Sequence, residues 1–235
     1  MLTVVTNLGF AVCVALALWI VVPYVYRLRN VRKLQERCAR TNSIVLTYDD
    51  GPSANFTAAL LGVLEEYNAP ATFFTLGVQV DNNSHMIPEL IAKGHEVGSH
   101  SYAHLNAWKD LPWRVAGDIE AGVKSLDRRN VPITYFRPPN GKITLGTLIQ
   151  TWLKGRRMAW WTIDSSDTWE NTLPLETLVD NVRAAGGGVV LLHDFERKTD
   201  KERNNFVLDV TRQLLELAKT ENFKVRTFGQ LMQDA

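Results

Sequence analysis

The sequence predicts an α/β protein built on a parallel sheet, and three observations lead to that prediction. Past residue 42, short apolar, β-branched or aromatic runs alternate seven times with longer segments of helical period, which is typical of parallel strands with helices packed outside. Polar clusters follow five of those runs, as expected where parallel strands end at one mouth. The hydrophobic content of 46% is enough for one sizeable core.

Strands and helices are expected in alternation along this part of the chain. The strands are predicted at 43–48, 71–76, 95–99, 133–136, 158–163, 188–192 and 223–227. Helices fit between them, for example at 56–68, 84–94, 111–129 and 203–220. A full eight-unit barrel takes about 250 residues, which is more than the chain offers past residue 42. A seven-strand barrel or an open doubly wound sheet therefore remains.

The N-terminal segment is apolar. No charged side chain occurs from Leu2 to Tyr26, and about 20 apolar helical residues cross a hydrocarbon core, so residues 1–26 are expected to form a transmembrane anchor. A cleaved signal peptide would have basic residues before its apolar run and small residues after it, which this run lacks. A buried core helix is disfavoured because the run has no polar face. Pro23 leaves open a kinked segment that enters one leaflet and turns back.

A basic segment follows at residues 27–41, and it is expected to be a juxtamembrane linker. It carries a single acid, Glu36, and six basic residues: Arg27, Arg29, Arg32, Lys33, Arg37 and Arg40. Basic flanks stay on the cytoplasmic side of a membrane and attract anionic headgroups. We therefore expect a single-pass membrane protein with residues 42–235 facing the cytoplasm. A solvated linker helix and an outward-facing domain are the alternatives.

Charge and cysteine content exclude some classes of protein. The near balance of 26 basic and 25 acidic residues argues against a nucleic-acid-binding protein. The two cysteines, Cys13 and Cys38, both precede residue 42, so the C-terminal domain has neither a disulfide framework nor a thiolate metal site. This composition is compatible with a reducing compartment.

Polar clusters lie directly after the predicted strands. In chain order they are Asp49 and Asp50, "HSYAH" (100–104), "RPPNG" (137–141), "DSSDTW" (164–169), and His193 with Asp194. Two imidazoles spaced four apart, together with a carboxylate pair, can supply the mixed nitrogen and oxygen ligands that suit zinc or a similar divalent ion.

Each cluster has an ordinary explanation when it is taken alone. A DD doublet is usually a solvated turn, and an H-x-x-x-H spacing arises by chance. Arg137 could lie on the surface, His193 could be a core histidine, and Asp167 could cap a helix. These explanations weaken when all must hold at once. His85 and His95 do not belong to any of these polar clusters and are expected to be structural or surface residues.

The whole set, in this order, resembles the polysaccharide deacetylase family, also called the NodB-homology domain or carbohydrate esterase family 4. "TYDDGPS", "HSYAH", "RPPNG", "DSSDTW" and "LLHD" match its five motifs over roughly residues 42–230. The resemblance implies a distorted (β/α)7 barrel, a divalent metal held by Asp-His-His, and removal of N-acetyl, sometimes O-acetyl, groups from saccharides.

The resemblance also implies a role for each matched residue. The metal ligands would be Asp50, His100 and His104, holding zinc or, as alternatives, cobalt, nickel or manganese. The catalytic residues would be Asp49 as general base, Arg137 paired with it, His193 as general acid, and Asp167 holding His193.

Two positions depart from the family pattern. The family usually has Tyr where this chain has Asn140, and it places Trp directly after the fourth-motif Asp, whereas Thr168 here precedes Trp169. Asn140 is still expected to stabilise the oxyanion through its backbone amide. Trp169 is expected at the substrate groove.

The predicted activity is a metal-dependent removal of N-acetyl groups from an amino-sugar saccharide at the membrane. A lipid-linked saccharide fits an anchored domain that faces the cytoplasm, whereas an outward-facing domain would act on peptidoglycan or an exopolysaccharide. Two further alternatives remain: a deformylase of a lipid-linked amino sugar, and a catalytically silent saccharide-binding domain on the same scaffold.

Overall fold

The computed structural model of the chain describes residues 2–195 and 201–233. The expected anchor at 1–26 is therefore described from Leu2, and the expected domain at 42–235 is described without residues 196–200, 234 and 235. The strands are β1 (Ser43–Asp49), β2 (Thr72–Thr75), β3 (Glu96–Ser99), β4 (Tyr135–Phe136), β5 (Arg157–Met158), β6 (Ile163–Asp164), β7 (Gly188–His193) and β8 (Lys224–Val225). The helices are α1 (Leu2–Thr41), α2 (Phe56–Glu66), α3 (Gly77–Asn82), α4 (Met86–Ala92), α5 (Pro112–Asp127), η1 (Pro139–Gly141), α6 (Leu145–Leu153), α7 (Leu175–Ala184), α8 (Lys201–Thr220) and α9 (Phe228–Gln233).

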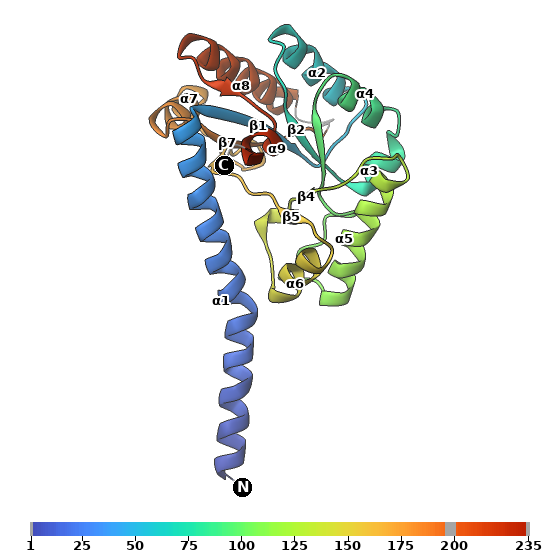
Figure 1. The fold of residues 1–235 in the computed structure, drawn as a ribbon, viewed down its shortest axis with the longest axis vertical. Helices are drawn as coiled ribbons and strands as arrows, with labels where there is room; N and C mark the ends of the chain where they lie inside the picture. Colours follow the sequence, from blue (N-terminus) through green and yellow to red (C-terminus); the bar gives the residue numbers. More distant parts are fainter. Residues whose placement is uncertain (1, 196–200, 234–235) are drawn as a thin grey trace.

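The described strands form one parallel sheet, as predicted. Its order is β5-β4-β3-β2-β1-β7-β6, and helices cover its outer side (Figure 1). The central strand β1 pairs with β7 along its length, so that Asp49 lies opposite His193. On its other side, β1 pairs first with β8 and then with β2. The carboxyl ends of all these strands therefore face one way.

The strand predicted at 158–163 is two short strands, β5 and β6, and this is a correction to the sequence analysis. Its first part bonds to β4, where Ala159 N–H donates to Phe136 O at 2.9 Å. Its last part bonds to β7, where Thr162 N–H donates to Val189 O at 2.9 Å. Because one segment joins both edges of the sheet, the sheet curls into an incomplete, distorted barrel.

Alternation along β1 separates the outer core from the barrel interior. Ile44, Leu46 and Tyr48 are fully buried against the helices of the outer layer, whereas Val45 faces the second core, inside the curl. Because successive side chains on a strand point to opposite faces, Thr47 and Asp49 share the inner face with Val45.

Helix α1 runs without a break from the apolar segment into the basic one, through Pro23. In its last turns, Leu34 and Cys38 are buried in the inner core. Gln35 donates hydrogen bonds to Ala185 O and Gly187 O at 2.9 and 3.1 Å. The segment expected to be a linker is thus the second half of one helix, and it packs on the barrel.

The first half of α1 extends away from the barrel toward the N-terminus (Figure 1). Apolar side chains such as Leu16, Leu18 and Val21 are at least half exposed there. Within the described residues, α1 is a helix long and apolar enough to cross a membrane by length and composition, and a signal sequence can share those properties.

Candidate active site

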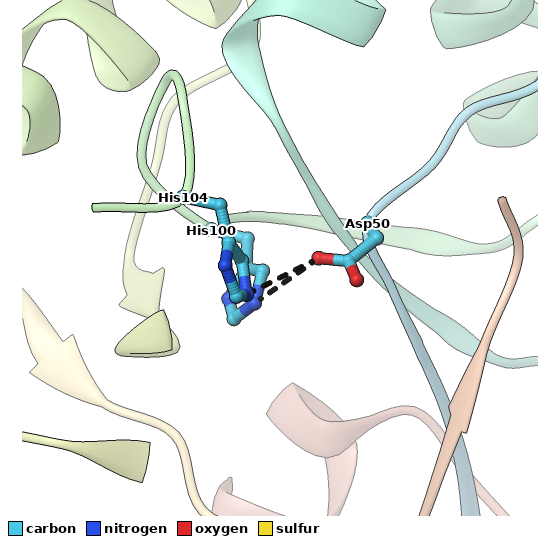
Figure 2. A group of neighbouring side chains, drawn as sticks. All are labelled: Asp50, His100 and His104. Atoms are coloured by element: carbon cyan, nitrogen blue, oxygen red, sulfur yellow. Dashed lines mark ion pairs between the residues drawn. The ribbon is translucent and has the colours of Figure 1, made fainter. Parts of the chain in front are cut away.

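Three side chains expected to bind a metal converge at the carboxyl ends of the strands. The ligand atoms of Asp50, His100 and His104 all lie within 4.8 Å of one another. Figure 2 shows both imidazoles facing the same carboxylate oxygen. Asp50 Oδ1 lies 3.5 Å from His100 Nε2 and 3.6 Å from His104 Nε2. Strands β1 and β3 deliver the three residues, since each comes directly after a strand or in the loop beyond it.

The backbone at this cluster takes an unusual conformation. Asp50 has a φ of 74°, Ser101 of 69° and His104 of 60°, in the left-handed region that non-glycine residues seldom adopt. Such strained positions gather at functional sites because the surrounding structure holds them there. The loop of His104 is held by its neighbours, since His104 N–H donates to Ser101 Oγ at 3.1 Å.

The residues present fit a divalent metal ion. Asp50 Oδ1 is buried and, among the described residues, has no hydrogen-bond partner, so a ligand at this point would satisfy it. His100 Nδ1–H donates to Arg137 O at 2.7 Å, which leaves Nε2 free to coordinate, as is usual for a metal-binding histidine. Burial lowers the pKa of His100 to about 3. The imidazole is therefore neutral, which is the form that binds metals.

The second aspartate, Asp49, forms a buried ion pair on the inner face of the barrel. Arg137 is fully buried and donates to Asp49 Oδ1 at 2.8 Å. Burial raises the pKa of Asp49 above its ordinary value, and the charge of Arg137 opposes that rise. Asp49 Oδ2 lies 3.7 Å from His100 Nε2. A carboxylate with a raised pKa thus borders the candidate metal-binding cluster without belonging to it.

His193 forms a second pair, with Asp167. The backbone N–H of His193 donates to Asp167 Oδ2 at 3.0 Å, and its Nδ1–H lies 2.8 Å from Oδ1. Burial alone would lower the pKa of His193, but the adjacent carboxylate raises it to about 9. His193 is therefore a cation near neutral pH and can donate a proton from Nε2.

The two residues that depart from the family pattern lie on the surface. Asn140 is exposed in η1 with a φ of 54°. Within the described residues, the amides of Gly141 and Lys142 close this turn, and that of Asn140 takes no part in it. Trp169 is 61% exposed, and Arg203 donates to its carbonyl oxygen. No described contact joins Trp169 to the metal cluster, so its place in a groove stays a prediction.

Several residues that support the site were not predicted from the sequence. Thr47 accepts a hydrogen bond from Arg137 at 2.8 Å, and the ring of Phe74 lies 4.1 Å from the Arg137 guanidinium carbon. Asp118, on α5, accepts from the backbone amides of Ala103 and Leu105 and so braces the loop of His104. The signal available in the sequence was an aspartate among the mostly apolar positions that α5 buries.

The remaining histidines have the ordinary roles expected of them. His95 is buried and its Nδ1 accepts from Ala71 N–H at 3.2 Å. Burial lowers the pKa of His95 to about 4. His85 is exposed at the start of α4.

A two-histidine, one-carboxylate cluster bordered by a buried carboxylate, at the strand ends of a curled parallel sheet, defines the class of metal-dependent hydrolases. Comparison with known proteins gives the family. Residues 36–152 match the family model described as polysaccharide deacetylase. The chain belongs to the polysaccharide deacetylase family, carbohydrate esterase family 4, and is a metal-dependent carbohydrate deacetylase that hydrolyses amide bonds.

Several curated relatives are deacetylases. The chain is 32% identical over 193 residues to a peptidoglycan-N-acetylglucosamine deacetylase of Bacillus cereus, covering 80% of this chain and 87% of that one. It is 32% identical over 169 residues to a chitooligosaccharide deacetylase of Bradyrhizobium, covering 70% and 76%. It spans about a third of the length of the Listeria monocytogenes deacetylase PgdA, since only 34% of that protein is covered at 32% identity.

Solved structures agree with the fold. The Bc1960 peptidoglycan N-acetylglucosamine deacetylase superimposes with a TM-score of 0.74 at 25% identity, covering 84% of this chain and 91% of that one. The peptidoglycan deacetylase PdaC of Bacillus subtilis gives 0.69 at 26%, covering 81% and 90%. A pseudoenzyme of the same family from Bacillus anthracis gives 0.70 at 19%, covering 83% and 66%, so the fold alone does not establish activity.

Proposed function

We propose that this protein removes N-acetyl groups from an amino-sugar saccharide at a membrane surface, using Asp50, His100 and His104 as metal ligands. The observation that carries the proposal is the orphaned, buried Asp50 oxygen facing two imidazoles, with a separate buried carboxylate beside it. A divalent ion held there, with zinc as the first expectation, would polarise the amide carbonyl and lower the pKa of a water molecule.

Asp49 is proposed as the general base. Its carboxylate takes a proton from the attacking water, and its raised pKa makes it a stronger base than a surface aspartate. Arg137, donating to Asp49 Oδ1, keeps that carboxylate ionised and fixed in orientation. The other carboxylate oxygen is then the one that accepts the proton.

His193 is proposed as the general acid. An amide nitrogen is a poor leaving group until it is protonated, and the cationic imidazole can donate the proton it needs. Asp167, bonded to Nδ1 of His193, directs Nε2 toward the substrate and holds the proton there near neutral pH. Since Asp49 and His193 end neighbouring strands, opposite each other, base and acid flank one reacting centre.

Asn140 and Trp169 are proposed to contact the substrate. The Asn140 amide, which the described residues leave unused in the turn, would donate to the developing oxyanion. The exposed Trp169 ring would stack on a sugar.

Helix α1 is proposed to remain as a membrane anchor rather than to be cleaved. Its second half supports this proposal, because Leu34 and Cys38 lie in the inner core. Arg27 also lies over Trp160 and Trp161, with its guanidinium carbon 5.7 and 5.3 Å from the two ring centroids. Cleavage after the apolar run would cut this continuous helix next to Arg27.

The side of the membrane determines the substrate. The basic residues after the apolar run favour a cytoplasmic domain, for which a lipid-linked saccharide is the proposed substrate. The named substrates of the relatives, peptidoglycan and chitooligosaccharides, share an N-acetylated amino sugar, and peptidoglycan would require an outward-facing domain. Protease added to intact spheroplasts distinguishes the two orientations. Protection of a C-terminal tag supports the cytoplasmic proposal, and digestion of the tag contradicts it.

Activity is tested by acetate release from N-acetylglucosamine oligomers and peptidoglycan fragments, using the full chain in detergent with added zinc. We expect acetate from at least one substrate, and loss of both bound metal and activity in His104→Ala. Release of formate from an N-formylated sugar, without acetate from any substrate, would favour a deformylase. A metal-loaded protein that binds saccharide and releases neither acid would be a silent binding domain.

A further inference from the structure

Exposed apolar side chains gather on α6, which contacts α1, and on α5 beside it. They belong to residues of α5, its preceding loop and α6, here called the apolar rim: Trp108 (47% exposed), Leu111 (50%), Trp113 (69%), Ile149 (48%), Trp152 (77%) and Leu153 (68%). A protein surface in water seldom exposes large apolar side chains together, so a cluster of this kind marks an interaction site.

The two helices of the rim are joined to each other, and α6 meets α1. Gln150 of α6 donates to Ala116 O in the first turns of α5 at 2.9 Å, which ties the two helices together. The start of α6 meets α1, because a Cβ placed on Gly146 would lie 3.0 Å from the ring of Trp19. Figure 1 shows α6 and the adjacent end of α5 as the parts of the barrel that extend furthest along α1 toward the N-terminus.

The point on α1 at which α6 packs is close to where the edge of a bilayer would lie. At a rise of 1.5 Å per residue, the helix from Leu2 to Leu18 extends about 25 Å. That length nearly crosses a hydrocarbon core of about 30 Å. If this segment lies in the core, then Trp19, and the start of α6 that packs on it, lie close to the edge of the core, next to the headgroups.

The composition of the rim matches that position. Tryptophan is enriched at membrane–water interfaces. Surfaces that lie in an interface combine Trp and Leu with basic residues. The basic side chains of Lys109, Arg114 and Lys154 are exposed on or directly after the same segments as the rim and would contact anionic lipid headgroups.

We propose that the apolar rim inserts into the headgroup layer of an anionic bilayer beside α1, so that the active-site mouth opens at the membrane surface. This inference rests on the proposed anchoring by α1. The rim is continuous with the site, because the loop that carries His104 leads into Trp108 and α5, and the Trp108 indole N–H donates to Ile143 O, just after η1, at 2.9 Å. Two of the five motif loops would thus face lipid headgroups, which favours a saccharide held at the membrane over a polymer remote from it.

The test measures which positions touch lipid in the full-length protein. Single cysteines at Trp113→Cys and Trp152→Cys are labelled with the fluorophore NBD, in a Cys13→Ala background where Cys38 stays buried. Labelled protein is reconstituted into vesicles of phosphatidylethanolamine and phosphatidylglycerol, with or without a lipid that carries a nitroxide near the top of its acyl chain.

Two further labels serve as matched controls. Leu16→Cys, 63% exposed on the first half of α1, reports whether the anchor is in the bilayer. Gln213→Cys, exposed on α8 at the far end of the barrel, reports a surface that should stay in water. Thermal unfolding of each variant confirms that it is folded.

We expect NBD at both rim positions to shift its emission to the blue in vesicles and to lose most of its intensity with the nitroxide lipid, while the Gln213→Cys label changes little. Quenching at Leu16→Cys without quenching at either rim position would overturn the rim proposal and leave the anchor intact. Absence of quenching at Leu16→Cys as well would show that the anchoring proposal itself is wrong.

Discussion

The Asp167–His193 pair allows a specific prediction of how kcat/KM depends on pH. In Asp167→Asn the side chain keeps its size but loses the charge that raises the pKa of His193 to about 9. Burial, the largest influence on His193 and opposite in direction, is then opposed only by the weaker charge effects of Asp49 and Asp50. The pKa of His193 should fall below the ordinary value of 6.5, so this proposed general acid should be deprotonated at the pH where the native enzyme works.

The expected size of the effect follows from the two pKa values. A fall from about 9 to 6.5 corresponds to roughly 3 kcal/mol, since one pKa unit is worth about 1.4 kcal/mol. At pH 8 the protonated fraction of His193 would drop about 30-fold, and kcat/KM for acetate release should drop by a similar factor.

The assay is a pH profile of kcat/KM for both proteins, with bound metal measured in parallel. The native profile should have an alkaline limb near pH 9, and the Asp167→Asn profile should have that limb below pH 6.5 with metal content unchanged. An alkaline limb that stays in place in the variant would refute the assignment of His193 as the acid held by Asp167.

The same pair should also contribute to stability. Because the folded pKa of His193 lies above its unfolded value, the stabilisation is present in full below pH 6.5 and disappears as pH rises through about 9. The difference in unfolding free energy between native protein and Asp167→Asn, measured by denaturant titration, should therefore shrink across that window. A difference that grows with pH would contradict the sign of the shift.

Three further predictions address the rest of the site. Arg137→Met leaves Asp49 buried without its partner and should lower the unfolding free energy by about 3–5 kcal/mol, with acetate release lost; a denaturant titration matching the native one would count against the pair. Gly122→Ala places a Cβ 2.4 Å from the Ser101 backbone, so the loop of His104 must shift and metal affinity should fall about 10- to 100-fold, whereas Gly117→Ala on the same helix meets nothing within 4 Å and should bind metal normally in a competition titration. Dialysis against a chelator should stop acetate release and lower the melting temperature, with zinc restoring both; a metal present at a thousand times its Kd contributes about 4 kcal/mol, and an unchanged melting temperature would argue that the cluster holds no metal.

The site residues at strand ends were predictable because the local sequence shows both where a buried strand ends and which polar residue stands there. Asp49 and Asp50 follow a buried strand, and His193 ends another, so parallel pairing alone brings them to one edge. The curl of the sheet was predictable only through the family resemblance. The split of 158–163 into β5 and β6 was not, because it depends on hydrogen bonds from one segment to two distant edges.

The role of 27–41 shows a different limit. The six basic residues of this segment indicated a juxtamembrane linker, yet Leu34 and Cys38 are buried in the inner core. Only the path of α1 past the barrel, a tertiary feature, determines which of its faces is covered. Gly122 and Asp118 belong to the same class, since each acts on the His104 loop from a helix that follows it in sequence.

The division of labour between two adjacent carboxylates is the central claim, and a matched pair of variants tests it most directly. Asp49→Asn and Asp50→Asn make the same chemical change at neighbouring positions, and each purified full-length protein is measured for bound metal and for acetate release. We predict that Asp49→Asn retains metal and loses turnover, whereas Asp50→Asn loses both. Equal metal content in the two variants, or turnover by Asp49→Asn, would contradict the assignment of one aspartate to the metal and the other to the proton.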